Sequence, residues 1–216
     1  MNRYFTLGAL LCLLISACDS IIAPPVDLSD QNIAQVFSSK ETETTARVVA
    51  FMDSTIFAAC NCQNVQEAYS EFFSNPTFSE PSFNESALDR LIIEIKGSGL
   101  FSEFWIVRRV NAPDSLKGVY LDINMNGKLF KLIESVGQDE ESIGEYYGYL
   151  MRDRNISPAL IAMFPYDYST INYKRPSVRL IIASHFIFLA ESKKYSIKRE
   201  KPVRIEDDED TGYVKK

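Results

Sequence analysis

Apolar residues recur at helical spacing through much of the first hundred residues. The clearest stripe has Ser82 or Asn84 as its candidate cap and Gly97 as its stop, and its apolar positions are Leu88, Leu91, Ile92 and Ile95. Recurrence every three or four residues is typical of a helix with one buried face. The same spacing predicts further helices near residues 30–37, 44–59 and 65–75. The N-terminal part of the chain is therefore expected to be helical.

The spacing of apolar residues changes after Gly99. Residues 104–110 are rich in β-branched and aromatic side chains, which favours a strand, and residues 119–124 and 128–136 are two further strand candidates. Asn126-Gly127 lies between the last two segments, and both residue types tolerate the positive φ angles of a type I′ hairpin turn. The pattern predicts a three-stranded antiparallel meander over residues 101–136.

Helical spacing returns in residues 139–164, which are predicted to form a helical insertion. Gly144 and Gly148 stand one helical turn apart there, which predicts that another backbone packs closely against them. Residues 178–190 fit either a helix face or a buried strand, and their β-branched and aromatic side chains favour the strand. The predicted fold class is α+β, with N-terminal helices packed on a small antiparallel sheet made of the meander and this strand.

A short apolar segment that ends in a cysteine begins the chain. Asn2 and Arg3 precede a leucine-rich stretch, and Ser16 and Ala17 lead directly into Cys18. This arrangement resembles the lipobox of bacterial lipoproteins, which implies cleavage before Cys18 and lipidation of its thiol. The alternatives are a secretory signal cut elsewhere and an uncleaved membrane span. A span needs about 20 apolar residues, and this stretch is shorter.

The lipobox resemblance divides the chain into four parts. They are a signal peptide over residues 1–17, a lipidated tether over 18–28, one globular α+β domain over 29–200 and an acidic, disordered tail over 201–216. The whole chain has a formal net charge of −6, and an acidic protein gains no counterion release on nucleic acid. Nucleic acid is therefore not expected as a partner, and the expected location is the bacterial cell envelope, lipid-anchored to its inner or outer membrane.

Cys60 and Cys62 are the thiols that remain once Cys12 leaves with the signal and Cys18 carries lipid. A Cys-x-Cys pair can close into a small disulfide ring in an oxidising compartment. It can also remain as two structural thiols, or act as a redox pair if one thiol has a depressed pKa. A metal role is the weaker interpretation, because no histidine or second cysteine pair lies nearby.

One segment resembles the start of an EF-hand calcium loop. Asp122, Asn124 and Asn126 offer oxygen ligands at alternate positions before Gly127. The twelfth position of the pattern, where the bidentate glutamate belongs, is Ile133. A plain hairpin turn is the competing interpretation.

Catalytic motifs are scarce in this sequence. Glu134-Ser135 followed by residues 148–151 resembles the lytic transglycosylases, which implies Glu134 as a general acid for glycosidic cleavage, although the second motif lacks its glutamine. The single histidine, His185, lies in an apolar stretch and is expected to be a core imidazole. No cofactor is expected.

A tyrosine-rich segment is the candidate binding surface. Tyr166, Tyr168, Tyr173 and Arg175 lie within ten residues of one another. Tyrosine and arginine often dominate interfaces, but tyrosines can equally fold back on the core of their own domain. The sequence thus predicts a lipid-anchored, non-enzymatic module that binds another envelope component, protein or glycan. A peptidoglycan-cleaving enzyme and a calcium-dependent binding domain are the alternatives.

Overall fold

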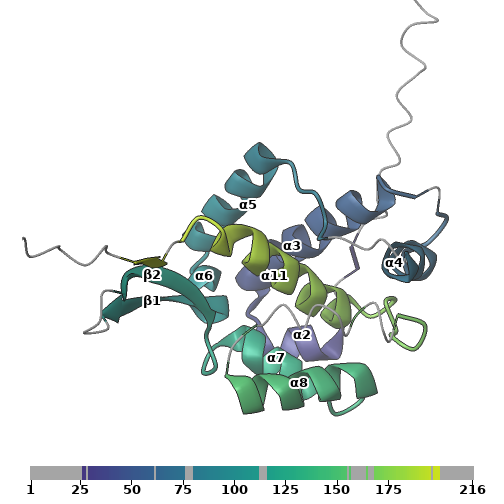
Figure 1. The fold of residues 1–216 in the computed structure, drawn as a ribbon. Coiled ribbons are helices and arrows are strands. Elements are labelled where there is room, and N and C mark those ends of the chain that lie inside the picture. Colours follow the sequence, from purple (N-terminus) through teal and green to yellow (C-terminus); the bar gives the residue numbers. More distant parts are fainter. Residues whose placement is uncertain are drawn as a thin grey trace, which may run out of the picture.

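The protein has an α+β fold in which helices surround one central helix and a small antiparallel sheet lies at the side (Figure 1). The computed structural model describes residues 26–27, 29–60, 62–75, 80–111, 116–154, 156, 164, 168–195 and 197–199. The expected signal peptide, nearly all of the tether and the acidic tail lie outside these residues. No helix within the described residues is both long enough and apolar enough to span a bilayer.

The first part of the chain is helical, as its apolar spacing predicts. Its helices are α2 (Gln31–Val36), α3 (Ser39–Phe57), α4 (Val65–Ser74) and α5 (Glu85–Gly97). A short helix, α6 (Leu100–Phe104), follows where the meander was predicted to begin, so the predicted start at residue 101 is wrong. The start of α3 lies five residues before the predicted start at 44. Ser38 and Glu41 form a capping box there, which satisfies backbone N–H groups of the first turn and lets the polar stretch join the helix.

The sheet contains three antiparallel strands in the order β1 (Trp105–Asn111), β2 (Leu116–Ile123) and β3 (Ile197–Arg199). Trp105 pairs with Ile123 at one end of the β1–β2 hairpin, and Asn111 pairs with Lys117 at the other. The short strand β3 pairs with the beginning of β2, with Leu116 opposite Arg199 and Gly118 opposite Ile197. The sheet is therefore built from the chain's middle and from a late segment.

The predicted third strand of the meander, residues 128–136, is wrong, because these residues form helix α7 (Lys128–Val136). The buried positions of α7 are Leu129, Phe130, Leu132, Ile133 and Val136, which is helical spacing. The predicted type I′ turn is also wrong, since Gly127 has a φ of −88° and serves as the N-cap of α7. The hairpin signal of Asn126-Gly127 suggested a strand here, but the apolar residues fall on one helical face.

The predicted strand at residues 178–190 is likewise wrong, because α11 (Pro176–Ser192) is a helix. Pro176 stands at its first turn, where the missing N–H costs no hydrogen bond. Every residue from Ser177 to Leu189 is buried, so no polar face marks the helical period. A helix that is buried on all sides has a continuous apolar sequence. It lacks the periodic polar positions that would distinguish it from a buried strand.

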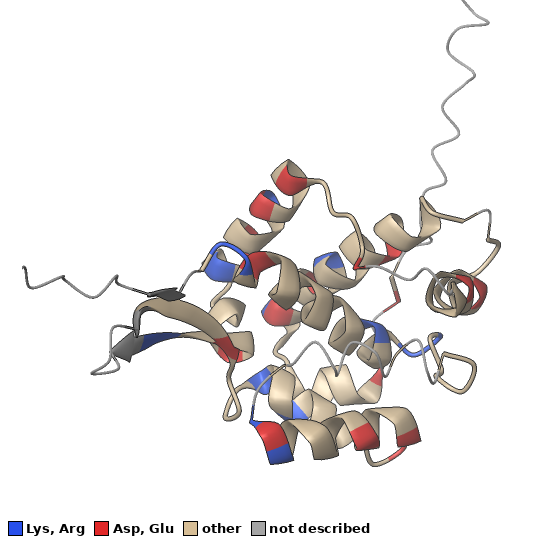
Figure 2. Cartoon of the chain, viewed as in Figure 1, with Lys and Arg blue, Asp and Glu red and all other residues tan. Residues whose placement is uncertain are grey.

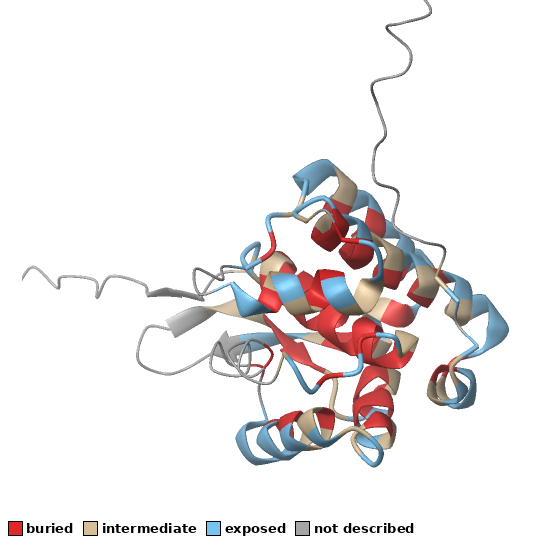
Figure 3. Cartoon of the chain, turned by 90° about the vertical axis from the view of Figure 1, so that its right-hand side faces the viewer, coloured by how far each residue is buried: buried red, intermediate tan, exposed pale blue. Residues whose placement is uncertain are grey.

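The helix α11 occupies the centre of the fold. It contacts α2, α3, α7 and β2, and buried residues gather around it while exposed residues face outward on the surrounding helices (Figure 3). Figure 2 shows acidic and basic residues mostly on the outer elements, as expected for a chain that buries one apolar core. Burial of this central helix is thus the main organising feature of the domain.

Helix α8 (Glu141–Asp153) lies within the predicted helical insertion at 139–164 and packs against α7. A Cβ added to Gly144 would lie 2.7 Å from the carbonyl oxygen of Gly137. Gly144 therefore permits the close backbone approach that the sequence suggested. Gly148 has no atom within 4 Å of its would-be Cβ, so the expectation is wrong for this second glycine.

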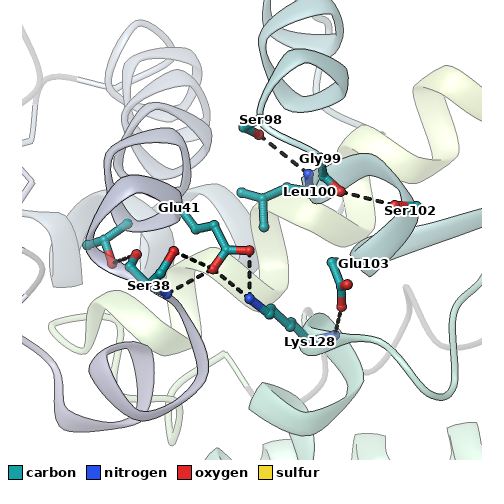
Figure 4. A network of polar contacts seen from close by, with 9 residues as sticks. Ser38, Glu41, Ser98, Gly99, Leu100, Ser102, Glu103 and Lys128 are labelled. Carbon is teal, nitrogen blue, oxygen red and sulfur yellow. Dashed lines mark hydrogen bonds and ion pairs between the residues drawn. The ribbon is translucent and has the colours of Figure 1, made fainter.

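A polar network ties α3, α6 and α7 together (Figure 4). Lys128 Nζ donates to both carboxylate oxygens of Glu41 at 2.6 Å, and the Lys128 backbone N–H donates to Glu103 Oε2 at 3.2 Å. Partial burial raises the pKa of Glu41, but hydrogen bonds from Lys128 and Ser38 outweigh it, so this pKa lies below its ordinary value. The network fixes where α7 begins.

Candidate functional site

A polar pocket of about 470 Å³ lies between α2, the end of α7 and the turn before α11. We call it the amide pocket, because amides are its commonest lining groups. Its lining residues are Asp30, Gln31, Asn32, Gln35, Ser135, Gln138, Asp139 and Arg175. Among the described residues, no aromatic or aliphatic side chain lines it, whereas most small-molecule pockets are largely apolar.

Capping and inter-helix hydrogen bonds position the inner wall of the amide pocket. Asp30 caps α2, and its second carboxylate oxygen accepts from the Ser177 hydroxyl at 2.6 Å. Ser135 on α7 donates to the Asn32 side-chain oxygen at 2.7 Å. These contacts join three segments that are far apart in the sequence, so the pocket exists only in the folded domain.

The outer groups of the amide pocket are available to a ligand. Gln31, Gln35 and Gln138 are exposed, and their side-chain amides make no hydrogen bond within the described part of the chain. The Arg175 guanidinium is half-buried and lies 3.8 Å from Asp139 Oδ2 and 4.0 Å from Glu140 Oε2. These distances are too long for hydrogen bonds, so its donors can still turn to a ligand.

The structure separates the residues of the predicted tyrosine surface. Tyr173 is fully buried, with its ring 5.0 Å from Tyr69 and 5.9 Å from Phe73 between centroids. Tyr168 is partly buried against the core, and Tyr166 lies outside the described residues. The prediction that Tyr173 presents a binding surface is therefore wrong. Arg175 is the member of this set that lines the amide pocket.

Glu134, the candidate general acid, is exposed on α7 and not at a strand end as the sequence suggested. Its carboxylate accepts a hydrogen bond from the Tyr147 hydroxyl at 3.0 Å. Glu134 does not line the amide pocket, although the next residue, Ser135, does. The geometry at Glu134 is that of a surface carboxylate which bridges α7 and α8.

The candidate calcium ligands bind other protein groups. Asp122 is buried at the end of β2 and accepts from Arg108 Nε at 2.6 Å. The Asn124 side-chain oxygen accepts from the Asn126 backbone N–H at 3.1 Å, and its nitrogen donates to the Ser102 carbonyl at 2.6 Å. The segment is the connection from β2 to α7, not a helix-flanked cation loop. Its glycine is needed because a Cβ on Gly127 would lie 2.0 Å from the Glu103 carbonyl oxygen.

Two buried polar groups belong to the core and not to an open site. His185 is fully buried on α11 and lies 2.9 Å from the Tyr146 hydroxyl, and burial lowers its pKa to about 3. Asp53 on α3 pairs with Arg179 on α11 and accepts from the Tyr69 hydroxyl at 2.8 Å. Burial raises the pKa of Asp53, and Arg179 opposes this rise.

A second pocket, of about 430 Å³, lies between the start of α5 and the end of α11. Phe83, Leu88 and Phe186 are apolar residues in its lining, while Glu80, Asp89 and two lysines are charged. Lys193 pairs with Glu80, and Lys194 donates to Asp89 at 2.6 Å. Four of the charged groups of this pocket, Glu80, Asp89, Lys193 and Lys194, thus already form ion pairs, in contrast to the exposed amides of the amide pocket.

Cys60 and Cys62 are joined by a disulfide just beyond the C-terminus of α3. Glu71 on α4 lies beside them, with its Oε2 atom 3.2 Å from Cys62 Sγ. The sequence singles out the two cysteines but not Glu71, because the spacing of nine residues gives no motif.

The glutamines of the amide pocket were not predicted from the sequence. They are scattered over two segments, and nothing in their spacing marks them as one site. Asp30 is the N-cap of α2, a role that by itself gives no sign of a pocket. The sequence feature that could have indicated the site is the density of glutamine and asparagine around residues 31–35. This feature indicates a pocket only when α2 is known to pack beside α7.

Comparison with known proteins assigns no family to this chain. No family model matches it, and no curated protein or solved structure matches it.

Proposed function

We propose that this protein is a lipid-anchored module of the bacterial cell envelope that binds a polar, hydroxyl-rich glycan in the amide pocket. The anchoring part rests on the lipobox-like segment that ends at Cys18. The binding part rests on one observation, the set of exposed amides beside a half-buried arginine that have no hydrogen-bond partner among the described residues.

The chemistry of the pocket favours a glycan over an apolar ligand or a protein interface. Sugar hydroxyls both donate and accept hydrogen bonds, and carboxamides do the same with their two ends. Asp30, Asp139 and Arg175 add charged acceptors and donors at the margins. Protein interfaces usually centre on buried aromatic anchors, and the amide pocket contains none.

The position of the pocket along the chain suits a membrane-proximal role. Asp30 stands twelve positions after Cys18, so an extended connection would be roughly 40 Å at most. A pocket that begins at Asp30 would therefore stay close to the lipid surface, where envelope glycans near the membrane are within reach.

The test is co-sedimentation of the protein with purified cell-wall glycan, with a Gln31→Ala/Gln138→Ala variant beside the wild type. We expect the double variant to lose about thirtyfold in affinity, since two net hydrogen bonds contribute on the order of 1 kcal/mol each and about 1.4 kcal/mol is a factor of ten. Thermal stability should be unchanged because both side chains are exposed. Gln63→Ala is the matched control, as Gln63 is exposed and does not line the pocket.

Two results would contradict the proposal. If the double variant and Gln63→Ala bind as the wild type does, the amide pocket is not the site. If wild type does not sediment with any envelope glycan, the ligand class is wrong. Arg175→Ala adds a further check, because it should weaken binding without the loss of stability expected for Tyr173→Ala in the core.

A further inference from the structure

A second candidate site, distinct from the amide pocket, consists of two cysteine sulfurs and one carboxylate. The Sγ atoms of Cys60 and Cys62 and a carboxylate oxygen of Glu71 all lie within 4.8 Å of one another. Cys60 is half-buried, Cys62 is 8% exposed and Glu71 is exposed. The group therefore reaches solvent on one side and the core on the other.

The small size of the disulfide ring argues against a structural role. A disulfide stabilises a fold mainly by closing a loop of the unfolded chain, and the effect grows with the length of the loop. Cys60 and Cys62 are two positions apart, so the loop that they close is very short. The bond restrains little of the chain that α3 and α4 do not already hold.

The position of Glu71 favours the reduced state of the pair. In the disulfide, Cys62 Sγ carries no hydrogen, so the Glu71 oxygen 3.2 Å away has no donor to accept from. After reduction, the Cys62 thiol can donate to this carboxylate, and a thiol–carboxylate hydrogen bond forms. A contact of this kind stabilises the dithiol relative to the disulfide.

We propose that Cys60 and Cys62 form a redox-active pair that exchanges its disulfide with substrate thiols, with Glu71 as the proton carrier for Cys62. This activity is independent of the amide pocket. The substrate class is a thiol-bearing protein or a small thiol of the same compartment.

The exchange proceeds in two steps that conserve electrons. A substrate thiolate attacks Sγ of Cys60, the more exposed sulfur, which forms a mixed disulfide and breaks the Cys60–Cys62 bond. Cys62 leaves as a thiolate and is protonated through Glu71. A second substrate thiolate attacks the mixed disulfide, which releases the oxidised substrate, and Cys60 leaves as a thiolate that takes a proton from water. Two substrate thiols are oxidised and one protein disulfide is reduced.

The reverse direction uses the same groups. Glu71 accepts the proton of the Cys62 thiol, and the resulting thiolate attacks a mixed disulfide at Cys60 to close the ring. General-base assistance by a positioned carboxylate should make this closing step faster. Glu71 is therefore expected to affect both the equilibrium and the rate.

The experiment equilibrates the full chain with glutathione buffers, traps thiols by alkylation and reads the redox state by intact mass. We expect millimolar reduced glutathione to open the Cys60–Cys62 disulfide in the wild type. Glu71→Gln should shift the equilibrium towards the disulfide about threefold or more, the ratio equivalent to one net hydrogen bond. It should also slow ring closure by oxidised glutathione about tenfold. The pH at which this rate rises should become higher, because the thiol must then ionise without the carboxylate.

Glu145→Gln is the control, since Glu145 is an exposed carboxylate on α8 and its loss changes the net charge equally. Cys62→Ser should accumulate the mixed disulfide at Cys60, because the resolving thiol is absent. A disulfide that resists millimolar glutathione in the folded wild type would overturn the proposal. The proposal would also be overturned if Glu71→Gln and Glu145→Gln had the same disulfide–dithiol equilibrium, the same rate of ring closure and the same pH dependence of that rate.

Discussion

At the scale of single residues, the fold depends on polar groups that are buried with few partners. His185 is the clearest case, because it is fully buried and has the Tyr146 hydroxyl beside Nδ1, while Nε2 has no partner within the described residues. A charged imidazole there would lose its hydration without gaining a counter-charge. The histidine is thus held neutral in the folded protein, in agreement with its lowered pKa.

The lowered pKa of His185 predicts a specific loss of stability in mild acid. The pKa falls from 6.5 in the unfolded chain to about 3 in the folded protein, so between these values the unfolded state binds a proton that the native state does not. The stability should therefore decrease as pH falls from 6.5 towards 3. Between pH 7 and about pH 5, we expect a loss of about 2 kcal/mol from this group.

Urea denaturation at the two pH values measures this effect, with His185→Gln as the comparison. Glutamine cannot be protonated, so the variant should lose about 2 kcal/mol less stability than the wild type over the same interval. The raised pKa of Asp53 acts in the opposite sense, since it favours folding at lower pH, and it is common to both proteins. An equal loss of stability in both proteins would contradict the assignment to His185.

At the scale of elements, the connection between β2 and α7 determines that a helix, and not a third hairpin strand, follows β2. Gly127 was predicted to be a hairpin glycine that needs a positive φ, yet its φ is negative and its role is steric. The backbone of α6 passes so close that a Cβ on Gly127 would lie 2.0 Å from the Glu103 carbonyl oxygen. The missing side chain, and not the free backbone, is what the fold requires here.

Gly127→Ala should therefore lower the free energy of unfolding by about 3 kcal/mol, because the contact is with backbone that cannot move aside cheaply. Gly148→Ala is the matched control. Gly148 is an exposed position of α8 with open space around it, and alanine there should stabilise the protein by about 0.5–1 kcal/mol. Thermal or urea denaturation separates the two outcomes, and a neutral Gly127→Ala would refute the close packing of α7 on α6.

Two helices, α7 and α11, were incorrectly predicted as strands. Amphipathic helices such as α5 were predicted, because their polar faces expose the helical period. The central helix α11 has no polar face from Ser177 to Leu189, so its β-branched residues were taken for a strand. Helix α7 was also taken for a strand, although its buried positions follow the helical period. For α11 strand propensity was given more weight than spacing, and for α7 the hairpin signal of Asn126-Gly127 was given more weight.

The candidate sites were only partly predictable for a related reason. The cysteine pair and Arg175 stand out in the sequence, whereas Glu71 and the glutamines of the amide pocket are brought to them by packing between separate elements. Tyr173 is indistinguishable from a surface tyrosine until the stack on Tyr69 and Phe73 is seen. Local sequence identifies residue types, and tertiary packing decides which of them meet.

At the scale of the whole molecule, the described residues form an α+β unit built around one buried helix, with the amide pocket at its surface. The proposal joins this unit to a lipid anchor at Cys18 through a short tether. On this account the amide pocket is presented near a membrane, and the remainder of the fold serves to hold α2, α7 and Arg175 together. The proposed function depends on the claim that Cys18 anchors the protein to a membrane.

The most direct test of that claim is metabolic labelling of expressing cells with radiolabelled palmitate. We predict that the wild-type chain incorporates label and sediments with membranes, and that Cys18→Ala does neither, because the lipidated thiol is absent. Cys12→Ala is the control, as it should leave labelling intact. Equal labelling of wild type and Cys18→Ala, or no labelling of the wild type, would contradict the account.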